Sequence, residues 1–171
     1  QHPRITLVTG SAGNKAYDRR KEIVEAAQHR IDSFIFTAED TNTEPFIDIC
    51  MEMQGYITNK DVASTVISDR LTAITNAIYD ARAHADRFNI LLIIGKGNER
   101  WIKDHRKHVP FDGDDHVVEG VDVADGPQAL GGEQDFAERD LAAYQAGVAA
   151  LGRDRHAGRR ADPDHGGDVL R

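Results

Sequence analysis

Apolar segments of two kinds alternate along the first two thirds of the chain. Strand-like runs occupy residues 4–9, 33–37, 63–68 and 88–94. Helical spacing of apolar residues connects them, over residues 19–30, 45–56 and 69–85. This alternation predicts an α/β fold with a Rossmann-like, mostly parallel sheet and helices on both faces. The nearly continuous apolar run at 88–94 is typical of a strand that is covered on both faces.

The composition changes near residue 118. Segment 119–171 holds 9 of the 15 glycines and no lysine, and its six arginines and eleven acids supply −5 of the net charge of −8. We therefore predict a folded domain over residues 1–118 and an extension over 119–171 that is rich in Ala, Gly, Asp and Arg. One helix is expected over 133–151, with the remainder of the extension poorly ordered.

Composition excludes several functional classes. With a net charge of −8 and a pI near 5.4, the chain has no basic surface that would suit nucleic acid. Its longest apolar run, Ile90–Ile94, is far shorter than the roughly 20 residues of a membrane span, and no signal peptide is evident. Cys50 has no internal disulfide partner, and the His105–His108 spacing lacks a second pair of metal ligands. We expect a cytoplasmic monomer without a metal, membrane or nucleic-acid partner.

Three loops are expected at the edge of the sheet where parallel strands end and ligands bind. The first contains Gly10, Gly13, Asn14 and Lys15 just before a helix. Glycines in this position are typical of an anion site next to a phosphate or nucleotide, because free backbone N–H groups point at the ligand. The loop matches neither the Walker A pattern nor the dinucleotide fingerprint.

The second loop places Glu39, Asp40 and Glu44 after a strand. Clustered carboxylates favour an ammonium or another cation, because their repulsion must be compensated. The simpler alternative is a helix N-cap at Asn42 or Thr43, with the acids solvated or favouring the helix dipole.

The third loop has Gly95 and Gly97 on either side of Lys96, with Glu99 two residues further on. Glycines directly after a buried strand suggest that another group approaches the backbone closely. A tight turn with a solvated lysine is the alternative.

Taken together, these loops resemble the C-terminal domain of the Mur ligases. The matching segments are GSAGNKAYDRRKEI (10–23), TAEDTNTEP (37–45), DRLTAI (69–74), LLIIGKGNERW (91–101) and PFDGDDHVV (110–118). They extend over about residues 4–118, where the composition changes. The Gly-Lys-Gly-x-Glu loop followed by the Pro-Phe-Asp segment is the most specific part of the resemblance.

The resemblance implies a function. In this family the domain binds the incoming amino acid, and the closest branch adds the third residue to UDP-N-acetylmuramoyl-L-Ala-D-Glu in peptidoglycan synthesis. ATP and Mg²⁺ are used to form an acyl phosphate, which the amine of the amino acid attacks. Because the family's N-terminal and central domains bind the UDP-sugar and ATP, we expect this chain alone to lack ligase activity and to contain no catalytic residue.

The resemblance also implies roles for single residues. Arg20 corresponds to an arginine that meets the amino acid's carboxylate, a task that suits a guanidinium. Gly95 and Glu99 correspond to positions that receive its distal amino group.

The loop at residues 39–42 departs from the family's Asp-Asn-Pro-Arg selectivity motif, because it reads Glu39, Asp40, Thr41, Asn42. Asn42 lacks the charge with which an arginine would pair the second carboxylate of meso-diaminopimelate. Asp40 adds a negative charge near Glu99. We therefore predict L-lysine or L-ornithine as the substrate rather than meso-diaminopimelate.

Two alternatives remain at this point. One is a related ligase of the folylpolyglutamate or cyanophycin synthetase type. The other is a phosphate- or nucleotide-binding Rossmann-like module without catalysis, which would use the loop from Gly10 to Lys15.

Overall fold

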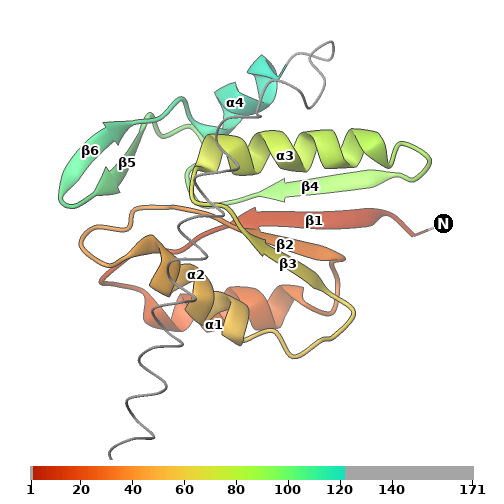
Figure 1. The fold of residues 1–171 in the computed structure, drawn as a ribbon, viewed down its shortest axis with the longest axis horizontal. Coiled ribbons are helices and arrows are strands. Elements are labelled where there is room, and N and C mark those ends of the chain that lie inside the picture. Colours follow the sequence, from red (N-terminus) through yellow and green to blue (C-terminus); the bar gives the residue numbers. More distant parts are fainter. Residues whose placement is uncertain (1, 122–171) are drawn as a thin grey trace, which may run out of the picture. The chain divides into compact units, whose positions relative to one another are not determined.

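The core of the molecule is a four-stranded sheet in which every pairing is parallel. A computed structural model describes residues 2–121 (Figure 1). The strand order is β3-β2-β1-β4, with β1 (Arg4–Thr9), β2 (Ser33–Phe36), β3 (Ala63–Val66) and β4 (Asn89–Ile93). The predicted α/β fold with a parallel sheet is confirmed.

Helices cover both faces of this sheet, as predicted (Figure 1). One face carries α1 (Tyr17–Ala27) and α2 (Phe46–Gly55), and the other carries α3 (Arg70–Ala83) and α4 (Asp114–Gly120). Neighbouring residues of a strand point to opposite faces, so β1 contributes to two cores. Leu7 packs with α1 and α2 in one core, and Val8 packs with α3 and α4 in the other.

The strand β4 lies at an edge of the sheet, since its one partner among the described strands is β1. Leu92 is 44% exposed and Ile94 is 38% exposed. The prediction that this apolar run is covered on both faces is therefore wrong for the described part of the chain. Leu91 and Ile93 pack under α3, whereas the alternate residues Leu92 and Ile94 point to the opposite face, which α1 and α2 leave open there.

A β-hairpin, which the sequence did not predict, follows the sheet. It consists of β5 (Trp101–Asp104) and β6 (Lys107–Pro110), paired antiparallel. Its two-residue turn, His105 and Arg106, has positive φ at both positions, 44° and 64°. The hairpin is joined to the loop after β2, because the Asn42 N–H donates to the Lys103 carbonyl at 3.0 Å.

The predicted helix over 133–151, and nearly all of the predicted extension over 119–171, lie outside the described residues. The helix α4 spans the predicted boundary at residue 118, and Val117 is part of the core under α3. Within residues 2–121, no helix is long and apolar enough to cross a membrane.

Candidate functional site

The three predicted loops meet at the carboxyl edge of the sheet. The Gly13 N–H donates to the Asp40 carbonyl at 2.8 Å, which joins the loops after β1 and β2. The Lys96 ammonium donates to Asp40 Oδ1, also at 2.8 Å, which joins the loop after β4 to the same point. Parallel strands place their ends on one edge, so loops that are far apart in sequence form a single candidate site.

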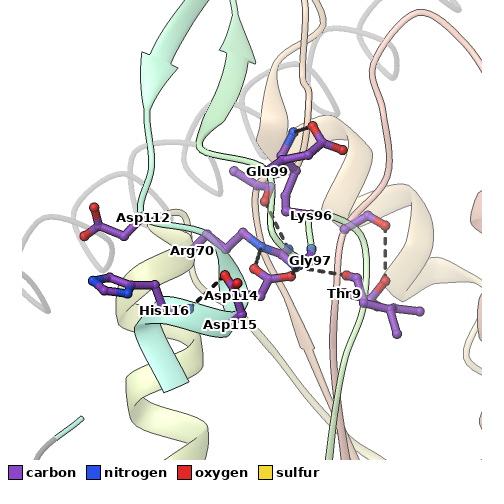
Figure 2. Close-up of polar contacts among 12 residues, drawn as sticks. Thr9, Arg70, Lys96, Gly97, Glu99, Asp112, Asp114, Asp115 and His116 are labelled. Carbon is purple, nitrogen blue, oxygen red and sulfur yellow. Dashed lines mark hydrogen bonds and ion pairs between the residues drawn. The ribbon is translucent and has the colours of Figure 1, made fainter. Parts of the chain in front are cut away.

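Lys96 occupies the centre of this site, between two carboxylates. Its side chain is 1% exposed, and Nζ lies 2.8 Å from Asp40 Oδ1. The same atom lies 2.6 Å from Glu99 Oε2 (Figure 2). Burial opposes the charge of Lys96, but the hydrogen bonds that its ammonium donates to Asp40 and Glu99 outweigh burial and raise its pKa. No role for Lys96 was predicted from the sequence. The glycines on either side of Lys96 are the feature of the sequence that could have indicated its importance.

The two carboxylates that bind Lys96 each keep one oxygen without a hydrogen bond to the described residues, Asp40 Oδ2 and Glu99 Oε1. Burial would raise the pKa of Asp40, but hydrogen bonds from Lys96 and from the Lys103 N–H hold it below its ordinary value. Glu99 remains 45% exposed. Both groups can therefore accept a further hydrogen bond from a ligand.

Glu39 brings a third carboxylate to the site. It is 6% exposed, and Oε2 has no hydrogen-bond partner among the described residues. Its other oxygen lies 3.7 Å from an Arg19 nitrogen. Burial raises the pKa of Glu39, partly offset by the charges of Arg19 and Arg70. A Cβ on Gly95 would lie 2.7 Å from Glu39 Oε2, so Glu39 and Gly95 are brought together.

Arg20 is buried, and most of its donors are already used. It donates to both oxygens of Glu44, at 2.8 and 2.7 Å, to Glu52 at 2.5 Å and to the Ala12 carbonyl at 3.2 Å. Its exposed fraction is 1%. The guanidinium therefore ties the loop after β1 to α2 and to the residue Glu44 just before it, and Nε is its one nitrogen without a hydrogen bond to a described residue.

The pair of Arg20 and Glu44 should make the free energy of unfolding depend on pH. The hydrogen bond from Arg20 lowers the pKa of Glu44, so the stabilisation is complete above the unfolded-state pKa and is lost as the pH falls through the lower folded value. Glu44→Gln should reduce the free energy of unfolding by roughly 1–2 kcal/mol at pH 7. It should also flatten the fall in stability below about pH 5. Urea unfolding at a series of pH values measures both, with the exposed Glu25→Gln as control. Parallel pH profiles for both variants would contradict the assignment.

Asn42 also joins the loops after β1 and β2. Its φ is 55°, and its side-chain amide donates to the Gly13 carbonyl at 2.8 Å and to the Asp40 carbonyl at 3.3 Å. Asparagine tolerates this left-handed backbone better than most residues. Its amide is therefore turned toward the neighbouring backbone.

The glycines of the first loop are explained by close packing. A Cβ on Gly10 would overlap the Thr37 carbonyl, and one on Gly13 would overlap the Thr41 carbonyl. Asn14 is held by Glu44 and Thr43. These contacts place carbonyl oxygens, which are acceptors, against both glycines. Of the four predicted phosphate-adjacent residues, only the exposed Lys15 presents a side-chain cation, and its charge helps to lower the pKa of Asp40.

A buried ion pair behind the site also escaped prediction. Arg70 and Asp114 lie at the starts of α3 and α4, with Nε and Oδ1 2.7 Å apart (Figure 2). Both residues stand in segments on which the family resemblance rests, but nothing in their spacing predicts that they meet. Among the described residues no group of three or more His, Cys, Asp or Glu side chains could hold a metal ion.

Comparison with known proteins identifies the relatives of this chain. No family model matches it. A UDP-N-acetylmuramyl-tripeptide synthetase of Bifidobacterium longum is 92% identical over 119 residues, which are 70% of this chain and 23% of that protein. A UDP-N-acetylmuramoyl-L-alanyl-D-glutamate–L-lysine ligase of Enterococcus faecalis is 31% identical over 121 residues, with the same coverage.

A solved structure supports the same relationship. A UDP-N-acetylmuramoyl-L-alanyl-D-glutamate–2,6-diaminopimelate ligase superimposes with a TM-score of 0.56 at 26% identity, over 68% of this chain and 23% of that one. The chain thus spans about a quarter of the length of the relatives it matches. The resemblance seen in the loops is confirmed, and the chain belongs to the Mur ligase family.

Proposed function

We propose that this chain forms the C-terminal, amino-acid-binding domain of a ligase that adds the third residue to UDP-N-acetylmuramoyl-L-Ala-D-Glu. Its task would be to hold the incoming amino acid so that the α-amine can attack an activated carboxyl group. Holding the two reacting groups in the right geometry speeds the reaction. The relatives' names describe this reaction with lysine or diaminopimelate. The alternative ligases of the folylpolyglutamate and cyanophycin type have no support among these relatives.

The charge balance at the carboxyl edge is the observation that carries the proposal. Asp40 and Glu99 each accept a hydrogen bond from the buried Lys96, whereas the charge of Glu39 is partly offset by Arg19 and Arg70. Asp40 Oδ2 and Glu99 Oε1 accept no hydrogen bond from the described residues. An ammonium group placed against these two oxygens would make charge-assisted hydrogen bonds to both carboxylates.

The same balance supports lysine or ornithine as the substrate. Meso-diaminopimelate carries a second carboxylate beside its distal amine, and here that group would meet three acids. Asn42 offers no compensating charge, and its amide already binds the Gly13 and Asp40 carbonyls. Bringing like charges together without compensation is unfavourable. A side chain that ends in a bare ammonium fits this site better.

The amino acid's own carboxylate needs a cation. In our proposal Arg20 does not contact this carboxylate directly, because its two terminal nitrogens already donate hydrogen bonds to Glu44 and Glu52. Two exposed cations at this edge are Lys15 and Arg19, and Arg19 lies 3.7 Å from Glu39. We assign the carboxylate contact to these two side chains, with Arg20 holding the loop of Lys15 and the start of α1, which carries Arg19, in place.

The described residues do not fit an ATP site of their own. The Gly13 N–H already donates to the Asp40 carbonyl, carbonyl oxygens pack against both Gly10 and Gly13, and the sequence contains no Walker A loop. This arrangement also gives no support to the alternative of a phosphate-binding module. We therefore assign ATP and Mg²⁺ to the other domains of the whole enzyme, which we expect to act in the cytoplasm.

A chimeric enzyme tests the proposal. In the Bifidobacterium longum relative, the matched segment is replaced by the corresponding residues of this chain, and ligation of three amino acids is measured. We expect kcat/KM for lysine or ornithine to exceed that for meso-diaminopimelate at least about tenfold, as expected for a misplaced charge. A preference for diaminopimelate would overturn the selectivity, and a folded chimera that ligates none of the three would overturn the function. This chain alone should show no ligation.

A further inference from the structure

A buried arginine–aspartate pair lies directly behind the Gly-Lys-Gly loop. The side chains of Arg70 and Asp114 are 0% and 6% exposed. Arg70 Nε lies 2.7 Å from Asp114 Oδ1, and Nη2 lies 2.8 Å from Oδ2 (Figure 2). A bidentate pair of this kind has one favourable geometry. The starts of α3 and α4 are therefore held at a fixed separation.

The aspartate of this pair also holds the loop. Asp114 Oδ2 accepts a hydrogen bond from the Gly97 N–H at 2.8 Å, and the Asp114 N–H donates to the Gly97 carbonyl at 2.7 Å. Gly97 has a φ of 54°. Both polar groups of this glycine are thus bound to one residue. Lys96 and Glu99, on either side of Gly97, extend toward the candidate site.

The arginine reaches the ends of two strands. Nη2 donates to the Ile94 carbonyl at 3.0 Å, and Nη1 donates to the Ala38 carbonyl at 3.4 Å. Ala38 precedes Glu39, and Ile94 precedes Gly95. One guanidinium therefore sets the distance between the acidic loop after β2 and the Gly-Lys-Gly loop after β4.

We propose that Arg70 and Asp114 are positioning residues that set the amino-acid specificity of the site by fixing these two loops relative to each other. Neither side chain is open to a ligand, so their effect passes through Lys96, Glu99 and Glu39. Buried ion pairs add little net stability compared with apolar residues of similar size, but they can fix one geometry. This inference rests on the proposed function, because the specificity belongs to that site.

The chimeric enzyme provides the test. With Asp114→Asn, one side-chain atom that accepts from Arg70 and Gly97 becomes a donor facing donors, so the loop loses its support. We expect the KM for lysine to rise about tenfold, with kcat and the KM for the UDP-linked substrate within about twofold. The preference in kcat/KM for lysine or ornithine over meso-diaminopimelate should fall as well. The matched control is Asp115→Asn, which makes the same change one residue later at an exposed pair with Arg100.

A second variant separates positioning from folding, because Asp114→Asn leaves Arg70 buried without its counter-charge. The double variant Arg70→Met/Asp114→Leu removes both charges and should fold, as judged by circular dichroism, with the same rise in the lysine KM. A folded variant that keeps the original lysine KM would overturn the inference. So would a double variant that does not fold, since the pair would then serve stability. If the unsubstituted chimera ligates no amino acid, the proposed function is wrong, and the positioning role of Arg70 and Asp114, which rests on it, is wrong as well.

Discussion

Gly10→Ala is expected to lower the free energy of unfolding by about 3 kcal/mol or more, the largest stability change predicted for this chain. The added Cβ would overlap the Thr37 carbonyl and press against Glu39. The strand ends have little room to separate, because the Thr37 N–H donates to the Thr9 carbonyl at 2.9 Å in the parallel pairing. Urea unfolding followed by far-ultraviolet circular dichroism measures the change.

Gly97→Ala is the matched control for this prediction. It is also a glycine in a loop at the carboxyl edge, but a Cβ there would meet nothing within 4 Å. Its φ of 54° alone should cost about 1–2 kcal/mol. Equal losses for the two variants would show that backbone conformation, and not the contact with Thr37, determines the need for Gly10.

Glu99→Gln in the chimeric enzyme should reduce kcat/KM for lysine by roughly 10–100-fold, which corresponds to the loss of a hydrogen bond to a charged group, about 1.5–3 kcal/mol. Glutamine keeps the shape of the side chain but removes the charge that an incoming ammonium would meet. The substitution also weakens the hydrogen bond from Lys96, whose Nζ lies 2.6 Å from Glu99 Oε2. The effect should appear mainly in the KM for the amino acid. Steady-state ligation with varied lysine measures it.

The control for this second prediction is Glu119→Gln, the same change at an exposed acid of α4. It should leave kcat/KM unaltered. If Glu99→Gln behaves like this control, Glu99 does not contact the amino acid, and the charge argument for lysine or ornithine would have to rest on Glu39 and Asp40 alone.

The sequence predicts the sheet and the site's location because both depend on local patterns. Apolar runs and helical spacing place the four strands of the parallel sheet and the helices α1, α2 and α3 to within a few residues, and parallel strands necessarily bring their carboxyl ends together. Glu39, Asp40, Gly95 and Glu99 were therefore expected side by side, and the structure brings them together. Lys96 was not, because its position between two acids depends on side-chain directions that spacing does not encode.

The hairpin β5–β6 was missed for a local reason. Two-residue hairpin turns with positive φ usually contain Asn-Gly or Asp-Gly, whereas here His105 and Arg106 adopt that conformation. The strands on either side have only four residues each. Neither the turn nor the strands carry the usual signal.

The ion pair of Arg70 and Asp114 behind the site was not predicted, for a different reason. Arg70 and Asp114 are far apart in sequence and are ordinary charged residues in their own segments. Only the packing of α3 against α4 brings them into contact. Arg20 shows the same limit, since a sequence motif identifies the arginine but not the acids, Glu44 and Glu52, that occupy it.

The strand order has a consequence for how this domain forms during synthesis. The first strand made, β1, lies inside the sheet, and its neighbour on one side is β4, whose Asn89 pairs with Arg4. A ribosome must therefore deliver β2, β3 and three helices before β1 is flanked on both sides. Until then one edge of β1 is open to other chains. The period of greatest risk of misassociation falls between the emergence of β3 and that of β4.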